Sequence, residues 1–271
     1  MRLTLLVFIK LGGSLITDKR VENSFREPVV TRLAQEIRAS LDVNPELKIL
    51  VGHGSGSFGH FAANRFKTAE GVHTQDEWRA FAHVSLVASE LNSRVAKLFD
   101  ESGLPIWRIQ PSASALSRDS EILELSTLSI RTALEKNLIP LVYGDVALDE
   151  IRGGTIISTE KIFFYLAHYL PVDSILLLGE VDGVYGIDGK VVSEITPMNY
   201  RQIQSAIGGS SGMDVTGGME TKVSDMLKLV QSKPNLSIRI LDGTENGLLN
   251  AVLLNKSSPG TLIHSGNVVA T

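Results

Sequence analysis

The chain has 271 residues, 43% of them hydrophobic and 21% charged, which suits one large globular domain or two fused lobes. Its net charge of −4 disfavours a general nucleic-acid surface, which would carry a basic excess. It contains no cysteine, which excludes disulfides, thiolate metal sites and cysteine nucleophiles; a cytoplasmic location is compatible with that composition.

The first apolar run, "LTLLVFI" at residues 3–9, has the length of a strand. It is too short to cross a membrane, and no small-residue cleavage site follows it. No other apolar run reaches the roughly 18 residues that a transmembrane helix needs. We therefore expect a buried first strand and no membrane partner.

Short β-branched or leucine-rich runs alternate with amphipathic ones along the chain. This alternation predicts an α/β fold with a mostly parallel sheet covered on both faces. The segment 144–158 contains an "RGG" turn between two extended runs and predicts a hairpin. The expected strands are Leu3–Lys10, Lys48–Gly52, Ile106–Ile109, Ile139–Gly144, Ser174–Leu178, Ser237–Leu241 and Gly260–His264. The expected helices are Pro28–Ser40, Thr74–Ser102, Leu125–Lys136, Lys161–Leu170 and Lys222–Gln231.

Glycine-rich segments follow several of these strands. They are "GGS" after the first, "GHGSGSFGH" after the second, "GD" at 144–145 and "GEVDGVYG" at 179–186, and "TGGMETK" opens a later helix. Ligands of open parallel sheets bind at the carboxyl ends of the strands. The coincidence predicts a binding site at that edge.

The loop "GSGSFG", Gly54 to Gly59, matches the dinucleotide pattern G-x-G-x-x-G. That fingerprint also needs an acidic residue at the end of the next strand, whereas Asp76 and Glu77 open a helix. The loop also falls short of a Walker A motif, because His60 and Phe61 replace its Lys and Ser/Thr. We interpret it as a nest of backbone N–H groups for a phosphate.

Two histidines flank this loop. His60 lies just past the last glycine, in the first turn of the following helix, where it could donate a hydrogen bond to a phosphate oxygen. His53 has no comparable argument, and we interpret it as structural. A tight turn that packs a helix on a strand is the alternative explanation of the whole loop.

Three lysines are candidates for contacting phosphate. Lys10 ends the first strand directly before a Gly-Gly turn, and Lys222 lies about one helical turn beyond another Gly-Gly pair. Lys19 stands in the polar loop "TDKR", where by itself a solvated role is the simpler interpretation.

The motifs "KLGGS", "GHGSGSFGH", "GDV", "VDGVYG" and "DVTGGMETK" occur in this order over nearly the whole chain. Together they resemble the amino acid kinase family, and within it the branch that phosphorylates isopentenyl phosphate, with fosfomycin kinases as relatives. The resemblance implies a three-layer αβα sandwich and often a homodimer. It also implies an acceptor-binding N-terminal lobe, 1–170, and a nucleotide-binding C-terminal lobe, 171–271, with the boundary at "LPVD".

The resemblance also assigns roles. It makes Lys10, Lys19, His60 and Lys222 catalytic, with ATP and Mg²⁺ as cofactors, and it names no protein metal ligand. Glu160 stands in "STEK", where relatives often carry Ser-x-Asp, so its role is open. The acceptor-side residues it implies are Ser55, Gly59, His60, Gly144, Asp145 and Phe81. The nucleotide-side residues are Lys10, Gly12, Gly13, Ser14, Gly56, Gly179, Glu180, Asp182, Tyr185, Gly218 and Lys222.

The expected reaction is phosphorylation of isopentenyl phosphate to the diphosphate by direct in-line transfer, and Phe81 is expected near an apolar acceptor pocket. A kinase for another small phosphate or phosphonate such as fosfomycin is the close alternative. A catalytically silent nucleotide-binding domain and a dinucleotide-dependent oxidoreductase are further alternatives. Retention of the three lysines and His60 argues against the silent domain.

Overall fold

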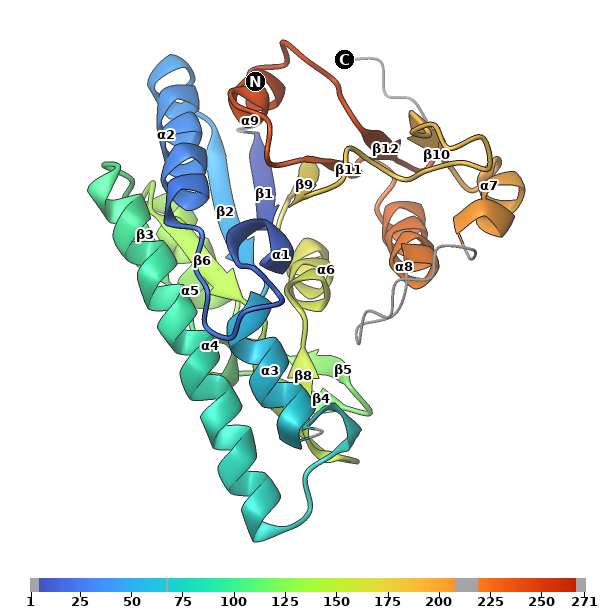
Figure 1. Ribbon diagram of the computed structural model, residues 1–271. Coiled ribbons are helices and arrows are strands. Elements are labelled where there is room, and N and C mark those ends of the chain that lie inside the picture. Colours follow the sequence, from blue (N-terminus) through green and yellow to red (C-terminus); the bar gives the residue numbers. More distant parts are fainter. Residues whose placement is uncertain (1–4, 67, 208–218, 267–271) are drawn as a thin grey trace.

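The computed structural model describes residues 5–66, 68–207 and 219–266. Helices cover both faces of a central sheet, so the chain forms three αβα layers (Figure 1). The central sheet has eight strands in the order β10-β12-β11-β9-β1-β2-β6-β3, and a second sheet has the order β5-β4-β7-β8. The described strands are β1 (Leu6–Leu11), β2 (Lys48–His53), β3 (Ile106–Arg108), β4 (Leu116–Arg118), β5 (Glu121–Glu124), β6 (Ile139–Tyr143), β7 (Asp145–Asp149), β8 (Gly153–Ile157), β9 (Ser174–Gly179), β10 (Glu194–Ile195), β11 (Ser237–Asp242) and β12 (Thr261–Ile263).

The central sheet is mostly parallel, as the sequence predicts. β1 pairs in parallel with β2 on one side and with β9 on the other, and β6 and β11 continue the sheet in parallel beyond them. Only the β11–β12 pairing is antiparallel among its described strands. The carboxyl ends of β1, β2, β6 and β9 therefore meet at one edge.

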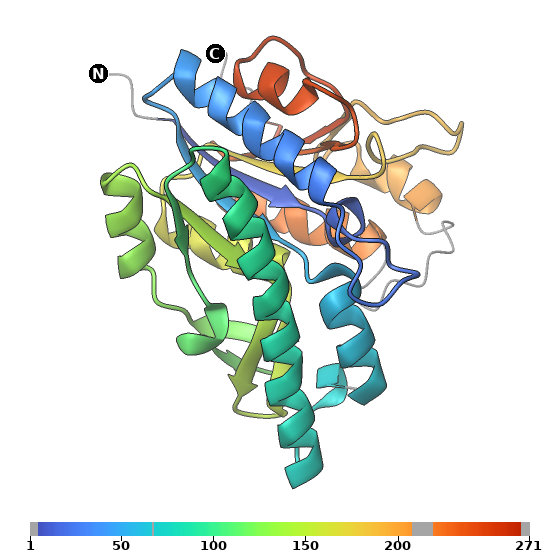
Figure 2. The same ribbon diagram turned by 60° about the vertical axis from the view of Figure 1, so that its left-hand side comes forward.

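The helices fall on the two faces of this sheet (Figure 2). Side chains of β1 alternate between the faces with the period of two that a strand imposes. Val7 and Ile9 pack with α2, α4 and α9, whereas Phe8 packs with α5, α6 and α8 and lies 5.1 Å from Phe163, ring centroid to centroid. The described helices are α1 (Gly13–Ile16), α2 (Glu27–Val43), α3 (Gly56–Phe66), α4 (Gln75–Glu101), α5 (Leu128–Glu135), α6 (Thr159–Tyr169), α7 (Tyr200–Ile207), α8 (Met219–Ser232) and α9 (Leu248–Leu253), with 3₁₀ turns η1 (Thr68–Glu70) and η2 (Pro111–Ala113).

The second sheet contains the predicted hairpin, β7–β8, which pairs antiparallel across residues 145–157. The β4–β5 hairpin beside it was not expected, because its strands are only three and four residues long. Its turn places Asp119 and Ser120 at φ of 50° and 68°. The carboxylate of Asp149 holds that turn by accepting hydrogen bonds from the N–H groups of both residues.

Helix ends are set by local caps that the periodicity did not show. Thr74 and Glu77 form a reciprocal capping box at the start of α4. The hydroxyl of Ser158 accepts from the N–H of Lys161, so α6 begins at Thr159, two residues before the expected start. No helix in the described ranges is long and apolar enough to cross a membrane.

Candidate active site

A cavity of about 870 Å³ opens at the carboxyl edge of the parallel strands. It receives residues from the loops after β1, β2, β6 and β9, from the start of α6 and from α8. Of the residues assigned to the site from sequence, it is lined by Lys10, Gly12, Gly13, Ser14, Lys19, Ser55, Gly56, Gly59, His60, Gly144, Asp145, Gly179, Glu180 and Lys222. Segments far apart in the chain therefore converge on one space, although the role of each residue stays a prediction.

The loops after β1 and β2 pack directly against each other. A Cβ on Gly13 would lie 2.8 Å from the nitrogen of Gly56, and one on Gly54 would lie 2.9 Å from the nitrogen of Gly13. Gly56 also adopts a φ of +50°, beside the hydroxyl of Thr17. These three glycines are therefore required by the contact between the loops. This reason differs from the helix-on-strand turn that the sequence offered as the alternative, and phosphate binding by the loop stays a prediction.

Gly144 and Gly179 differ from these three. A Cβ on Gly144 would meet no protein atom nearer than 3.5 Å, and one on Gly179 none nearer than 3.8 Å. Both residues line the cavity, and neither has a positive φ. A side chain at either position would therefore extend into space that the cavity provides.

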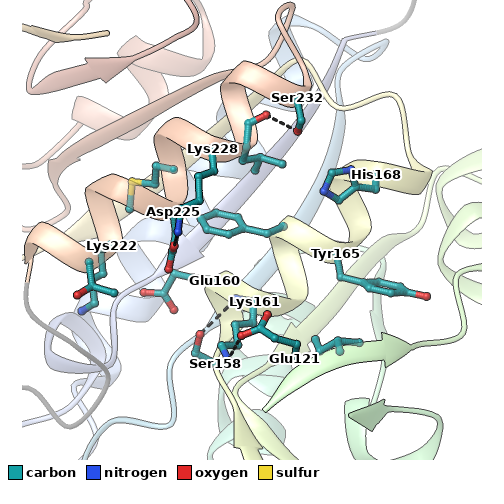
Figure 3. A pocket seen from close by; sticks show the side chains of 15 residues that line it. Glu121, Ser158, Glu160, Lys161, Tyr165, His168, Lys222, Asp225, Lys228 and Ser232 are labelled. Atoms are coloured by element: carbon teal, nitrogen blue, oxygen red, sulfur yellow. Dashed lines mark hydrogen bonds and ion pairs between the residues drawn. The ribbon is translucent and has the colours of Figure 1, made fainter. Parts of the chain in front are cut away.

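Glu160, at the start of α6, forms an ion pair with Lys10 at the end of β1. The two side chains are only 16% and 15% exposed. Burial, the largest influence, raises the pKa of the Glu160 carboxyl, but the charge and hydrogen bond of Lys10, together with the charge of Lys222, outweigh it and leave the pKa lowered. Figure 3 shows Glu160 on α6 facing Lys222 on α8. Glu160 thus stands between two lysines that the sequence places at the phosphates.

His60 lines the cavity from the second turn of α3. The expectation placed it in the first turn, but α3 already begins inside the glycine run at Gly56. The hydroxyl of Thr17 accepts from the N–H of Ser57 there and so caps the helix from another loop. The Nε2 atom of His60 lies 3.1 Å from the side-chain nitrogen of Asn64, which also lines the cavity.

Asp145 is 2% exposed and is held by its neighbours. Its carboxylate accepts from the hydroxyl of Ser85 at 2.9 Å, from the N–H of Ser112 at 3.2 Å and from its own neighbour Val146 at 2.8 Å. These bonds fix the residue at the cavity wall, but they also occupy much of its capacity to accept hydrogen bonds.

Some assigned residues lie elsewhere. Phe81 is 9% exposed and packs behind the wall, edge-on to Trp78, whereas Val84 of the same helix face lines the cavity. Asp182 and Tyr185 are not among the lining residues and hydrogen-bond each other. Gly218 lies outside the described residues. Two exposed members do line the cavity: Glu180, which forms an ion pair with Arg26, and Lys19, which stands in the loop after α1.

A second groove of about 610 Å³ separates α6 from α8 (Figure 3). It shares Ser158, Glu160, Lys161, Lys222 and Met226 with the main cavity. Its charged side chains are largely paired with each other, Lys161 with Glu121 and Lys228 with Asp225.

The described residues contain no cluster of three or more side chains suited to a metal ion. The carboxylate beside Lys10 and Lys222, that of Glu160, is engaged by Lys10. Mg²⁺ is commonly held by substrate phosphates and water with few protein ligands, so this site fits a Mg²⁺ ion that enters with a nucleotide.

The model of the amino acid kinase family matches residues 6–242. The chain belongs to the amino acid kinase family. An isopentenyl phosphate kinase of Methanocaldococcus jannaschii is 35% identical over 231 residues, 83% of this chain and 87% of that one. One of Haloferax volcanii is 32% identical over 224 residues, 83% of this chain and 88% of that one.

A solved structure of isopentenyl phosphate kinase superimposes on this amino acid kinase with a TM-score of 0.79 and 26% identity, covering 95% of this chain and all of that one. The αβα architecture expected from the resemblance is therefore confirmed, and the chain is a phosphotransferase. A kinase of this family uses ATP as its phosphoryl donor.

Sequence reasoning left Glu160 of this kinase open and did not name Asn64, Thr159 or Ser120, all of which line the cavity. A signal was present for Glu160, since Ser158 is a capping residue directly after the hairpin, and a helix that starts there brings the next residues to the sheet edge. Ser120 lies in the unexpected β4–β5 turn, and no sequence pattern pointed to it.

Proposed function

We propose that this chain is an isopentenyl phosphate kinase, which transfers the terminal phosphoryl group of ATP to isopentenyl phosphate. The observation that carries the proposal is that Lys10, Lys222 and His60 line one cavity, in a chain that is 35% identical to the M. jannaschii isopentenyl phosphate kinase over 231 residues. Mg²⁺ enters with ATP, the acceptor occupies the N-terminal lobe 1–170 and the nucleotide the C-terminal lobe 171–271. The same proposal includes a homodimer formed through the N-terminal lobe.

In the reaction, an acceptor phosphate oxygen forms a bond to the γ-phosphorus of ATP, and the bond from that phosphorus to the β,γ-bridging oxygen breaks to release ADP. A phosphate monoester has a second pKa of about 6, so its oxygens are largely deprotonated at neutral pH. The site therefore needs positioning and charge stabilisation more than a general base. Bound Mg²⁺ would supply part of that charge.

The cationic side chains share the remaining task. Lys10 and Lys222 would lie against the transferring phosphoryl group and offset the repulsion between two anionic substrates, with Lys19 at the cavity mouth. Glu160 holds Lys10 in place by an ion pair. We assign Glu160 to orienting these lysines, since a carboxylate there would repel phosphate and cannot bind it directly.

His60 would hold the acceptor phosphate by a donated hydrogen bond and orient one oxygen in line with ATP. Asn64, 3.1 Å from its Nε2 atom, fixes the ring on the cavity side of α3. The apolar tail would then lie along Val84, Ala88 and Ile156, which line the same cavity.

A kinase for a small hydrophilic phosphonate such as fosfomycin is the second candidate. Polar side chains share the acceptor end with the apolar ones, namely Asn64, Glu70, Ser120 and Thr155. The hydroxyls of Ser120 and Thr155 satisfy each other at 2.9 Å, which lowers their demand for a polar ligand. The apolar acceptor is therefore the better fit.

The test is a ³¹P NMR spectrum of the reaction of ATP with isopentenyl phosphate, together with the His60→Ala variant. The proposal predicts that the single phosphorus signal of isopentenyl phosphate is replaced by a pair of coupled diphosphate signals distinct from those of ADP. It also predicts a variant with a raised KM for the acceptor and a nearly unchanged KM for ATP. Wild-type kcat/KM for the acceptor in His60→Ala would remove the assigned role.

A further inference from the structure

His53 is a fully buried histidine at the end of β2 that the phosphoryl-transfer scheme does not use. Its Nδ1 atom lies 3.0 Å from the carbonyl oxygen of Gly54, and its Nε2 atom lies 3.1 Å from the side-chain nitrogen of Asn92 in α4. The ring also stacks on Tyr143 with a centroid distance of 5.7 Å and an interplanar angle of 9°. Both ring nitrogens and one face of the imidazole thus have partners.

Hydrogen bonds link Arg108, Asn92, His53 and the Gly54 carbonyl in series. The groups at the two ends of this series fix the direction of each bond. Arg108 donates from Nε to the amide oxygen of Asn92 at 2.9 Å, and a guanidinium can only donate. The amide NH₂ of Asn92 therefore faces Nε2 of His53, which must accept. At the other end the Gly54 carbonyl can only accept, so Nδ1 carries the proton. One neutral tautomer of His53 satisfies all three bonds.

The bond to Gly54 sets the orientation of the next peptide. In a planar trans peptide the C=O and N–H groups point in opposite directions. Because His53 draws the Gly54 carbonyl towards the core, the N–H of Ser55 points away from the ring. Gly54 and Ser55 both line the cavity, and the N–H of Ser55 makes no hydrogen bond to another described residue. It is thus free to donate to an anion in the cavity.

We propose that His53 is a positioning residue for the phosphate loop, which aims the Ser55 N–H into the cavity by holding the Gly54 carbonyl in the core. The inference rests on the proposed function for the identity of the anion, a phosphate group of a substrate. It extends the structural interpretation of His53 by giving the residue a specific task in the loop. Arg108 orients the amide of Asn92, and Asn92 in turn fixes the tautomer of His53.

Two substitutions separate the two ring nitrogens. In His53→Asn the short amide can place an N–H donor where Nδ1 lies, whereas in His53→Gln the longer amide reaches the position of Nε2 and Asn92. A buried carbonyl that loses its donor costs enough to disturb the loop, so His53→Gln should lose about 10- to 100-fold in kcat/KM for isopentenyl phosphate. His53→Asn should retain about tenfold more activity than His53→Gln.

Ile37→Val removes one methylene from the buried face of α2 and serves as the control for a loss of stability without a change in the loop. This variant should retain wild-type kcat/KM. The positioning role is wrong if His53→Asn and His53→Gln lose equal activity, or if each loses activity in proportion to the decrease in its Tm. The wild-type enzyme is assayed first. If it shows no turnover with isopentenyl phosphate, the proposed function is refuted, and the role of His53 is then tested by NMR alone.

That measurement does not depend on turnover or on folded variants. A long-range ¹H–¹⁵N NMR spectrum of histidine-labelled wild-type protein at pH 7 reports which ring nitrogen of each histidine carries a proton. The proposal expects His53 to be locked in the neutral form with the proton on Nδ1. A His53 signal with the proton on Nε2, or a rapidly exchanging mixture, would overturn it.

Discussion

Glu160 at the start of α6 pairs with Lys10 at the end of β1, which joins the central strand of the sheet to the helix that packs beneath it. The charges of Lys10 and Lys222 both stabilise the ionised carboxylate. The carboxylate of Glu160 therefore offsets part of the repulsion between two cations at the cavity edge.

Glu160→Gln should lower kcat by at least about tenfold, because Lys10 loses the partner that fixes its ammonium group. The lost charge interaction should also lower the free energy of unfolding by about 1–3 kcal/mol. The readouts are a coupled ADP-release assay and thermal unfolding. Glu160→Asp, which keeps the charge, is the matched control and should recover part of the kcat; equal losses in both variants would argue against an electrostatic role.

Gly144→Ala and Gly13→Ala should have opposite phenotypes. The Cβ at Gly144 meets no protein atom nearer than 3.5 Å, so the variant should keep its Tm but bind acceptor more weakly. The Cβ at Gly13 would lie 2.8 Å from the Gly56 nitrogen, so that variant should lose about 1–3 kcal/mol of stability. Thermal melts and acceptor KM values distinguish them. A Gly144→Ala protein with wild-type acceptor KM would show that the substrate does not approach this strand end.

Phe81→Ala should shift acceptor preference towards longer prenyl phosphates. Phe81 packs with Val84 in the cluster behind the cavity wall, so removing its ring lets that wall recede. The cost in stability should be about 3–5 kcal/mol, and Phe81→Leu offers a milder version. The measurement is the ratio of kcat/KM for geranyl phosphate to that for isopentenyl phosphate. Val95→Ala, farther along α4 in the separate core cluster against the central sheet, is the control. An unchanged ratio would remove Phe81 from the acceptor side.

Acid should destabilise the protein through His53. Burial, the largest cause, lowers the pKa of its ring to about 4, and the positive charge of Arg108 acts in the same direction, whereas the hydrogen bond to Gly54 opposes it. The unfolded state, with a pKa near 6.5, binds the proton first. Stability is therefore fully present above about pH 6.5 and falls by about 3 kcal/mol as the pH drops to about 4.

Urea unfolding at several pH values measures this slope. His53→Asn, which has no titrating ring, should give a flatter profile between pH 6.5 and 4. An identical slope in the variant would assign the acid sensitivity to other groups.

The parallel sheet, its flanking helices and the edge that carries the cavity followed from the sequence because continuous apolar strands and glycine-rich ends are local signals. The ion pair of Glu160 with Lys10 spans 150 positions, and no spacing rule connects such residues. The glycine loop shows the same limit. Its pattern indicated a phosphate nest, but the contact of Gly13 with Gly54 and Gly56 depends on two strands lying side by side. His53 was interpreted as structural because its sequence context offered no argument comparable to that for His60, and its partners Asn92 and Tyr143 lie on elements distant in the chain.

The identity of the acceptor is tested most directly by measuring kcat/KM for ADP release with ATP against a panel of acceptors. The panel holds isopentenyl phosphate, dimethylallyl phosphate, geranyl phosphate, fosfomycin, UMP and glutamate. The highest kcat/KM is expected for isopentenyl phosphate. A higher value for fosfomycin, UMP or glutamate, or no ADP release with any of the six, would contradict it.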